Sequence, residues 1–194
     1  FFLRQENNLL QNALQKFRTE KEIQDGLREV HKNIMLAEII GLDVSNFFKS
    51  AMINRGSIHG IKKDMVVLDE KSNLVGRVIG PISLREARIQ LITDNESGVG
   101  VFSQLKGVSG ILAGDGNGMC SFKYVLATNK DIREGEDVLT SGREGIFPSG
   151  IKVGKIVSIA RDTSLFKEIK VEPYFDLRRL ERVAVIMKEP AEIF

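Results

Sequence analysis

A short pattern occurs twice in the chain, first as Leu74-Val75-Gly76-Arg77-Val78-Ile79 and again as Lys152-Val153-Gly154-Lys155-Ile156-Val157. A second β-branched run follows each copy, at Ile89-Gln90-Leu91 and at Ile169-Lys170-Val171. The same order with similar gaps indicates two copies of one β-unit. A glycine inside a strand relieves crowding where the strand bends sharply, as strands do in small barrels. The repeat therefore predicts two small β-barrels.

Short β-branched runs separated by turns fill the chain from residue 37 onward. The turn signals are Asp94-Asn95, Asp115-Gly116-Asn117-Gly118, Ser141-Gly142 and Ser149-Gly150. Many short strands with glycine turns at close spacing are typical of an all-β sandwich or barrel. We place the first barrel unit at residues 37–107 and the second at residues 108–194, with the boundary between Gly107 and Gly118.

The first 36 residues have a helical period instead. Leu3, Leu10, Leu14 and Phe17 are spaced by seven, four and three residues, which is a heptad seam, and Asn7 falls on the same seam. A polar Asn on such a seam lowers stability but fixes the register and the oligomeric state. We expect these five residues to mediate self-association.

The apolar positions continue at Ile23, Leu27, Val30 and Ile34, after a step of six residues from Phe17 that resembles a stutter in the heptad register. An amphipathic helix of this kind can pack on its own domain or pair with a second copy. We favour a homodimer, because no partner helix follows and a lone long helix has nothing else against which to bury its stripe. We therefore predict a coiled-coil helix over residues 1–36.

The composition limits the chemistry that the chain can perform. Its 194 residues include 28 basic and 26 acidic side chains, and the net charge of +2 gives no general attraction to nucleic acid. The single cysteine, Cys120, excludes an intramolecular disulfide and a thiolate metal site, and the chain has only two histidines. We expect no cofactor, no metal and no nucleic-acid partner.

Three motifs carry a resemblance to a known family. They are Thr140–Ile156, the run Leu74–Val78 followed by Leu91-Ile92-Thr93-Asp94, and Glu6-Asn7-Asn8-Leu9-Leu10 at the start of the helix. In this order, and over nearly the whole chain, the sequence resembles the MreC family of rod shape-determining proteins.

The resemblance implies a mainly β protein in which a coiled coil precedes two small barrels, with a chymotrypsin-like double-barrel topology but no catalysis. It implies a scaffold of the elongation machinery that makes lateral peptidoglycan and maintains rod shape. The implied partners are a class B penicillin-binding protein (the elongation transpeptidase), MreD, a RodA-type glycosyltransferase, the MreB filament and a second copy of the chain. The implied location is the periplasmic side of the cytoplasmic membrane, with a transmembrane anchor ahead of Phe1.

A degenerate or cryptic serine hydrolase is the alternative, because the double-barrel topology invites it. Its candidate triad would be His59, Asp94 and Ser141. However, His59 sits in a glycine-rich turn, and Ser141 is expected where a strand enters a turn. A membrane-fusion adaptor is a further alternative, but such proteins flank a helical hairpin with β-halves, whereas here a single helix comes first.

Exposed aromatic side chains are the expected means of binding a protein partner. Phe122 and Tyr124 lie two positions apart in an alternating run, so they either face the interior of the second barrel or form a stripe for a partner. Tyr174 and Phe175 follow Pro173 in an expected turn, where a core role is less automatic. We name Phe122, Tyr124, Tyr174 and Phe175 as candidate partner-binding residues.

Overall fold

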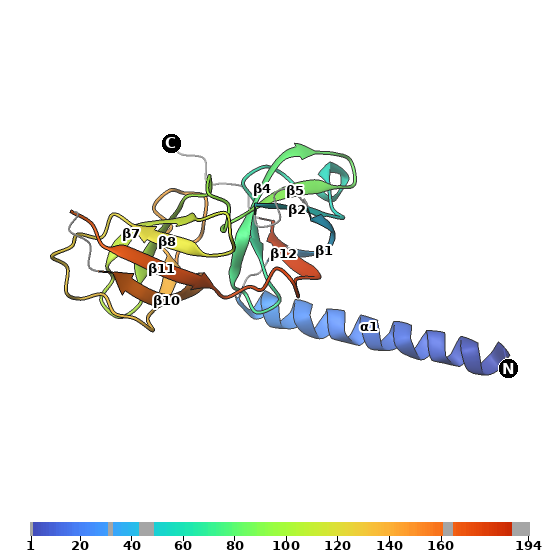
Figure 1. Cartoon of the computed structure of the whole chain (residues 1–194). Helices are drawn as coiled ribbons and strands as arrows, with labels where there is room; N and C mark the ends of the chain where they lie inside the picture. Colours follow the sequence, from blue (N-terminus) through green and yellow to red (C-terminus); the bar gives the residue numbers. More distant parts are fainter. Residues whose placement is uncertain (1, 31–32, 43–48, 161–164, 188–194) are drawn as a thin grey trace.

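A long helix and two β-barrels make up the computed structural model, which describes residues 2–30, 33–42, 49–160 and 165–187. Helix α1 (Phe2–Val30) runs past barrel 1 and projects well beyond it (Figure 1). Its side chains are described from Asn7 to Leu27. Within the described ranges, no helix combines the length and the apolar character needed to cross a lipid bilayer.

Barrel 1 is closed by antiparallel strands in the order β1-β12-β3-β4-β5-β2. These strands are β1 (Ile34–Leu42), β2 (Ser50–Ile53), β3 (Val66–Leu68), β4 (Leu74–Ile82), β5 (Ala87–Leu91) and β12 (Arg182–Ile186). A short 3-10 helix, η1 (Ser57–His59), follows β2. The inner face of this barrel is a continuous apolar core because every strand contributes buried aliphatic side chains.

Barrel 2 is closed in the order β10-β11-β8-β7-β6-β9. Its strands are β6 (Val99–Ser103), β7 (Ser109–Gly114), β8 (Cys120–Lys123), β9 (Asp137–Thr140), β10 (Lys152–Ala160) and β11 (Glu168–Pro173). The predicted turn at residues 115–118 joins β7 to β8, and the Asp115 carboxylate accepts hydrogen bonds from the Asn117 and Met119 amides (2.7 and 3.1 Å).

The two barrels have the same topology. Read around barrel 1 from β3, the strand order is β3-β4-β5-β2-β1-β12, and read around barrel 2 from β9 it is β9-β10-β11-β8-β7-β6. Strand β12 therefore takes in barrel 1 the place that β6 takes in barrel 2. The prediction of a helix followed by two small β-barrels is confirmed.

The barrels do not follow the predicted ranges 37–107 and 108–194. Strand β6 lies within the first range but belongs to barrel 2, and β12 lies within the second range but closes barrel 1. The reason is pairing: β12 bonds to β1 on one side and to β3 on the other, and its Val183, Ala184 and Val185 are fully buried. No local feature of the sequence shows which barrel such an apolar strand completes.

The repeated glycine has the expected steric role in both barrels. A Cβ atom on Gly76 of β4 would lie 1.8 Å from the carbonyl oxygen of Gln90, and one on Gly154 of β10 would lie 2.2 Å from that of Glu172. Either distance is far inside van der Waals contact, so only glycine lets the next strand approach this closely. The two glycines occupy equivalent strands, as the sequence repeat predicts.

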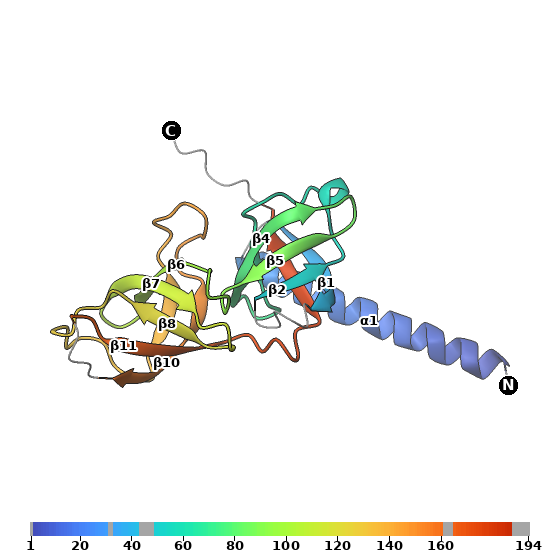
Figure 2. The ribbon, with the colours of Figure 1, turned by 45° about the horizontal axis from the view of Figure 1, so that its top comes forward.

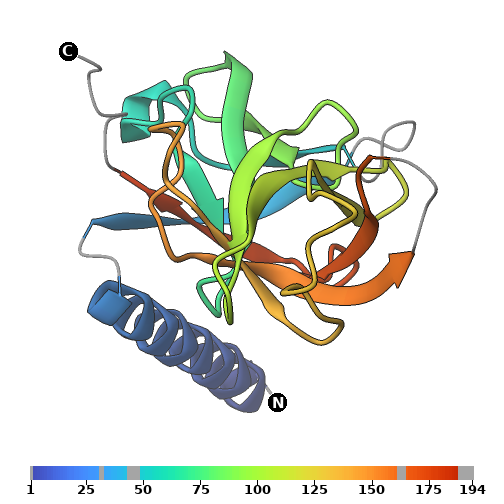
Figure 3. The ribbon, with the colours of Figure 1, turned by 90° about the vertical axis from the view of Figure 1, so that its left-hand side faces the viewer.

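Helix α1 is shorter than predicted, because Ile34, which continues the predicted helical stripe, begins strand β1. The C-terminal part of the helix packs on barrel 1: Leu27 is only 1% exposed and belongs to the main core, and Ile23 is packed against that core. Packing on its own domain, the possibility that we disfavoured, is therefore correct for this part of the helix. Figure 3, which views the molecule from the barrel 2 end, shows α1 outside both barrels.

Candidate protein-binding surfaces

An uncovered apolar stripe runs along the N-terminal part of α1. Leu10, Leu14 and Phe17 are more than half exposed, and Phe17 reaches 71%. Asn7, on the same predicted seam, is also exposed, whereas the side chain of Leu3 lies outside the described residues. Large apolar side chains gathered on one exposed face are typical of a protein-interaction site. We call Asn7, Leu10, Leu14 and Phe17 the outer stripe.

A second apolar surface lies on barrel 2, where the chain leaves β8 and approaches β11. Tyr124, Leu126, Leu165 and Phe166 are exposed there, and we call them the tip patch. The rings of Tyr124 and Phe166 meet edge to face with centroids 5.8 Å apart. Leu126 and Phe166 form an isolated β-bridge, and the Ala127 amide donates to the Leu165 carbonyl at 2.9 Å. The patch is thus held by backbone pairing at the barrel end away from α1 (Figure 2).

The backbone at Tyr124 explains why this residue is exposed although Phe122 is not. Strand β8 ends at Lys123, and Tyr124 has a φ of +68°, a left-handed conformation that is uncommon for a bulky side chain. The alternation of the strand is broken at that point, so Tyr124 is 59% exposed while Phe122 is 1% exposed. Burial contradicts the assignment of Phe122 to a partner-binding surface, and it does the same for Phe175, since both fill apolar core.

Tyr174 is half-buried and lies beside the link between β11 and β12. Its hydroxyl donates a hydrogen bond to Asp137 Oδ1, and Lys152 Nζ lies 3.4 Å from the other carboxylate oxygen. Desolvation, followed by the hydrogen bond to Asp137 and the negative charge of that residue, raises the pKa of Tyr174 to about 12. Tyr174 therefore stays a neutral donor over the physiological pH range.

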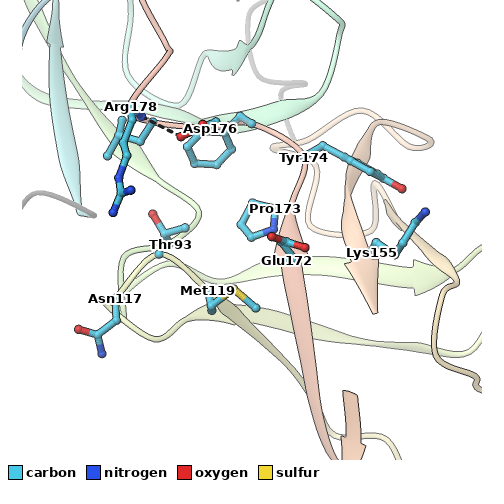
Figure 4. Close-up of a pocket in the computed structure, with 12 residues that line it drawn as sticks. Thr93, Asn117, Met119, Lys155, Glu172, Pro173, Tyr174, Asp176 and Arg178 are labelled. Carbon is cyan, nitrogen blue, oxygen red and sulfur yellow. Dashed lines mark hydrogen bonds between the residues drawn. The ribbon is translucent and has the colours of Figure 1, made fainter. Parts of the chain in front are cut away.

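The same tyrosine lines a groove of about 670 Å³ between the barrels (Figure 4). Thr93 comes from the link after β5, Met119 from the β7–β8 turn and Lys155 from β10. Beside the groove, the Gly116 amide donates a hydrogen bond to the Thr93 carbonyl at 2.9 Å, which joins the β7–β8 turn of barrel 2 to the link after β5. Its lining mixes acidic, basic and apolar side chains, so it has no single electrostatic character.

The candidate triad residues are each held in a separate local turn. His59 Nδ1 accepts a hydrogen bond from the Gly56 amide (3.1 Å), Asp94 accepts one from Gln90 Nε2 (2.7 Å), and Ser141 Oγ accepts one from the Arg143 amide (3.3 Å). The partners of these three side chains are thus neighbours in sequence, and no hydrogen bond in the described part of the chain joins any two of the three residues. A Ser–His–Asp relay requires such bonds.

Cys120 is buried, and its Sγ lies 3.4 Å from the Ile92 carbonyl oxygen. Burial, with a smaller contribution from the charge of Asp115, raises the pKa of the thiol to about 12. Such a thiol is neutral and unreactive at pH 7. Among the described residues, no three His, Cys, Asp or Glu side chains are grouped as a metal site would require.

Residues 39–187, which include both barrels apart from the start of β1, match the family described as rod shape-determining protein MreC, barrel core. The chain belongs to the MreC family. It is 28% identical to the cell shape-determining protein MreC of Geobacillus stearothermophilus over 165 residues, which is 80% of this chain and 57% of that protein. The chain therefore spans little more than half the length of this MreC relative.

Solved MreC structures have the same fold. The crystal structure of MreC from Pseudomonas aeruginosa superposes with a TM-score of 0.75 at 29% identity, over 79% of this chain and 99% of that one. A more distant likeness, with a TM-score of 0.61 at 17% identity over 80% of this chain and 100% of the other, is to a complex between a penicillin-binding protein (PBP2) and MreC from Helicobacter pylori. At that identity the likeness concerns the fold alone.

Proposed function

We propose that the chain is the periplasmic part of a non-catalytic scaffold in the machinery that makes lateral peptidoglycan. It self-associates through the outer stripe of α1 and binds the elongation transpeptidase, a class B penicillin-binding protein. The observation that carries the proposal is the presence, in an MreC-family chain, of two exposed apolar surfaces on different elements, α1 and barrel 2. A scaffold needs separate surfaces for separate partners.

The tip patch is the proposed surface for the transpeptidase. A protein of the same fold, from Helicobacter pylori, has been solved in complex with a penicillin-binding protein, which supports a partner of this class. Tyr124 supplies a large, rigid ring with a polar end, the kind of side chain that is enriched at binding hot spots. Tyr174 borders a different surface, the inter-barrel groove, and it is a secondary candidate. MreD, the RodA-type glycosyltransferase and the MreB filament are the further partners that we expect from family membership.

Binding to the full-length transpeptidase tests this assignment. We expect Tyr124→Ala and Phe166→Ala each to weaken binding at least tenfold, since loss of a hot-spot side chain costs about 2 kcal/mol or more. Leu105→Ala is the control, because Leu105 is an apolar residue elsewhere on barrel 2 that is even more exposed than Tyr124 and Phe166. Unchanged affinity in both tip-patch variants would reject the tip patch as the transpeptidase site.

Self-association is tested by Leu14→Asp or Leu10→Asp, measured by light scattering. A charge on the seam has to be desolvated without a partner, which costs several kcal/mol, so we expect monomers with folded barrels. Leu9→Asp is the control, since Leu9 is equally exposed but lies off the seam. A Leu14→Asp chain that remains dimeric would contradict the proposal.

The proposal also separates the scaffold from the serine hydrolase. We expect a fluorophosphonate probe to leave Ser141 unlabelled in the full chain, because the Ser141 hydroxyl meets no histidine among the residues that the structure describes. Specific labelling of Ser141, lost in Ser141→Ala, would favour the hydrolase.

The proposed periplasmic location is tested by protease accessibility. We expect the barrels of the membrane-anchored protein to be digested by protease added to spheroplasts and not by protease confined to the cytoplasm.

A further inference from the structure

Helix α1 carries two stripes on different faces. Each residue of an α-helix advances by about 100° around the axis. The outer stripe and the set Lys16, Glu20, Ile23 and Leu27 are therefore centred about 130° apart. Helix α1 is continuous from Phe2 to Val30, so the six-residue step after Phe17 is a change of face rather than a stutter within one seam.

The second set of residues fastens the helix to barrel 1, and we call it the clasp. Leu27 is buried in the core, and Ile23 packs beside that core. Lys16 Nζ lies 3.4 Å from Glu38 Oε1 on β1, and Glu20 Oε1 lies 3.8 Å from Arg182 Nη1 on β12. Glu38 and Arg182 are directly paired across the two strands, so both ion pairs end at one place on the barrel wall.

Arg182 is well suited to hold the helix. Its side chain is only 20% exposed, and its Nε donates to Glu70 Oε1 at 2.9 Å while Nη1 faces Glu20. One guanidinium thus bridges a carboxylate on the helix and another on the loop that follows β3, an arrangement for which the planar fork of arginine is suited. The apolar anchors and the ion pairs together set the direction in which α1 leaves barrel 1 (Figure 1).

We propose that α1 keeps its clasp on its own barrel 1 while its outer stripe pairs with a second copy, so that the barrels of the dimer lie on the outside of the helix pair. The inference rests on the proposed self-association. A second helix packs at an interaxial distance of about 8–10 Å, and on the outer stripe it meets no clasp residue. If the two stripes shared a face, pairing would instead require the helix to leave the barrel.

Zero-length cross-linking of the full chain tests this arrangement. A carbodiimide activates a carboxylate, the lysine amine displaces the urea, and an amide forms only between groups already in contact, as Lys16 and Glu38 are. Dimers are assembled from equal amounts of ordinary and ¹⁵N-labelled chains, and the Lys16–Glu38 peptide is analysed by mass spectrometry. We expect both halves of the peptide to carry the same label, with equal yield in the wild-type dimer and in Leu14→Asp monomers.

A cross-linked peptide with one labelled and one unlabelled half would show that the helix reaches the partner's barrel. A cross-link yield more than twofold higher in the Leu14→Asp monomer than in the wild-type dimer would show that pairing releases the clasp. Either result overturns the inference. Leu27→Asp should lower the yield at least fivefold and leave the dimer mass unchanged, and Glu38→Gln should abolish the cross-link as a chemical control. A wild-type chain that is monomeric at every concentration refutes the proposed self-association instead, and the cross-link then still reports on the clasp.

Discussion

The two barrels share a strand order but differ in the origin of their sixth strand and in the elements on their outer surface. Barrel 2 is made from one stretch of chain, β6 to β11, whereas barrel 1 takes its sixth strand, β12, from beyond barrel 2. Barrel 1 also carries the helix, while barrel 2 carries the exposed tip patch. The strand order is therefore common to both barrels, and the features that distinguish them are the late strand β12 and α1 on barrel 1 and the tip patch on barrel 2.

Removal of residues 182–194, which include β12, should unfold barrel 1 and leave barrel 2 folded. Barrel 1 loses the strand that pairs with both β1 and β3, together with three fully buried side chains, Val183, Ala184 and Val185. We expect amide protection to vanish in β1 and β3 and to persist in β7, β8 and β10, as measured by hydrogen exchange. Protection that persists in both barrels would show that barrel 1 does not need β12.

Alanine at the repeated glycine tests whether the barrels are sterically equivalent. In Gly76→Ala and Gly154→Ala the new methyl group meets a neighbouring backbone carbonyl, and we expect each to destabilise its own barrel by about 3 kcal/mol or more, at or above the upper end of overpacking costs. Gly98→Ala is the control, since nothing lies within 4 Å of the position that its Cβ would take. Urea denaturation monitored by NMR signals from each barrel would measure these losses of stability. A Gly154→Ala variant as stable as the wild type would show that the two glycines are not sterically equivalent.

Alanine variants of Phe122 and Tyr124 distinguish a core residue of barrel 2 from a surface residue. Phe122→Ala should lower the free energy of unfolding by about 3–5 kcal/mol because it leaves a cavity. Tyr124→Ala should lower it by less than about 1 kcal/mol while weakening transpeptidase binding. Denaturant midpoints of the two variants provide the measurement, and equal losses of stability would mean that Tyr124 is a core residue.

The smallest expected effect concerns alkaline pH. The pKa of Tyr174 is raised from 10.0 to about 12, so its contribution to stability is complete below pH 10 and is lost as the pH rises from 10 to 12. Tyr174→Phe should remove this part of the pH dependence, while the contribution of Cys120 stays the same in both proteins. Unfolding free energies measured between pH 8 and 11.5 would test it, and identical slopes in the two proteins would contradict the raised pKa of Tyr174.

Local patterns in the sequence predicted the helix, the strands and the duplicated unit, because glycine spacing and β-branched runs report on local geometry. They did not predict the membership of β6 and β12, which depends on pairing between strands far apart in sequence. The apolar period of α1 places Ile23 and Leu27 on a different face from Leu10 and Leu14, but it could not show which face packs on barrel 1, because that depends on tertiary contacts.

For the candidate surfaces, alternation placed Phe122 and Tyr124 on one face, and a single backbone torsion at Tyr124 separated them. No residue type announces that torsion, since a positive φ is expected of glycine or asparagine and not of tyrosine. Phe175 was assigned to a surface because it follows a proline, yet the crossing between the barrels buries it. Turn signals indicate where the chain bends and not what the bend covers.

The position of β12 also reverses the order in which the barrels can mature during synthesis. A nascent chain that has been synthesised and exported as far as β11 already holds every strand of barrel 2, whereas barrel 1 still presents the open edges of β1 and β3. The barrel that is translated first is thus the last to close. A chain that ends before β12 would expose the unpaired edges of β1 and β3, and these edges would make it more susceptible to proteases than the complete molecule.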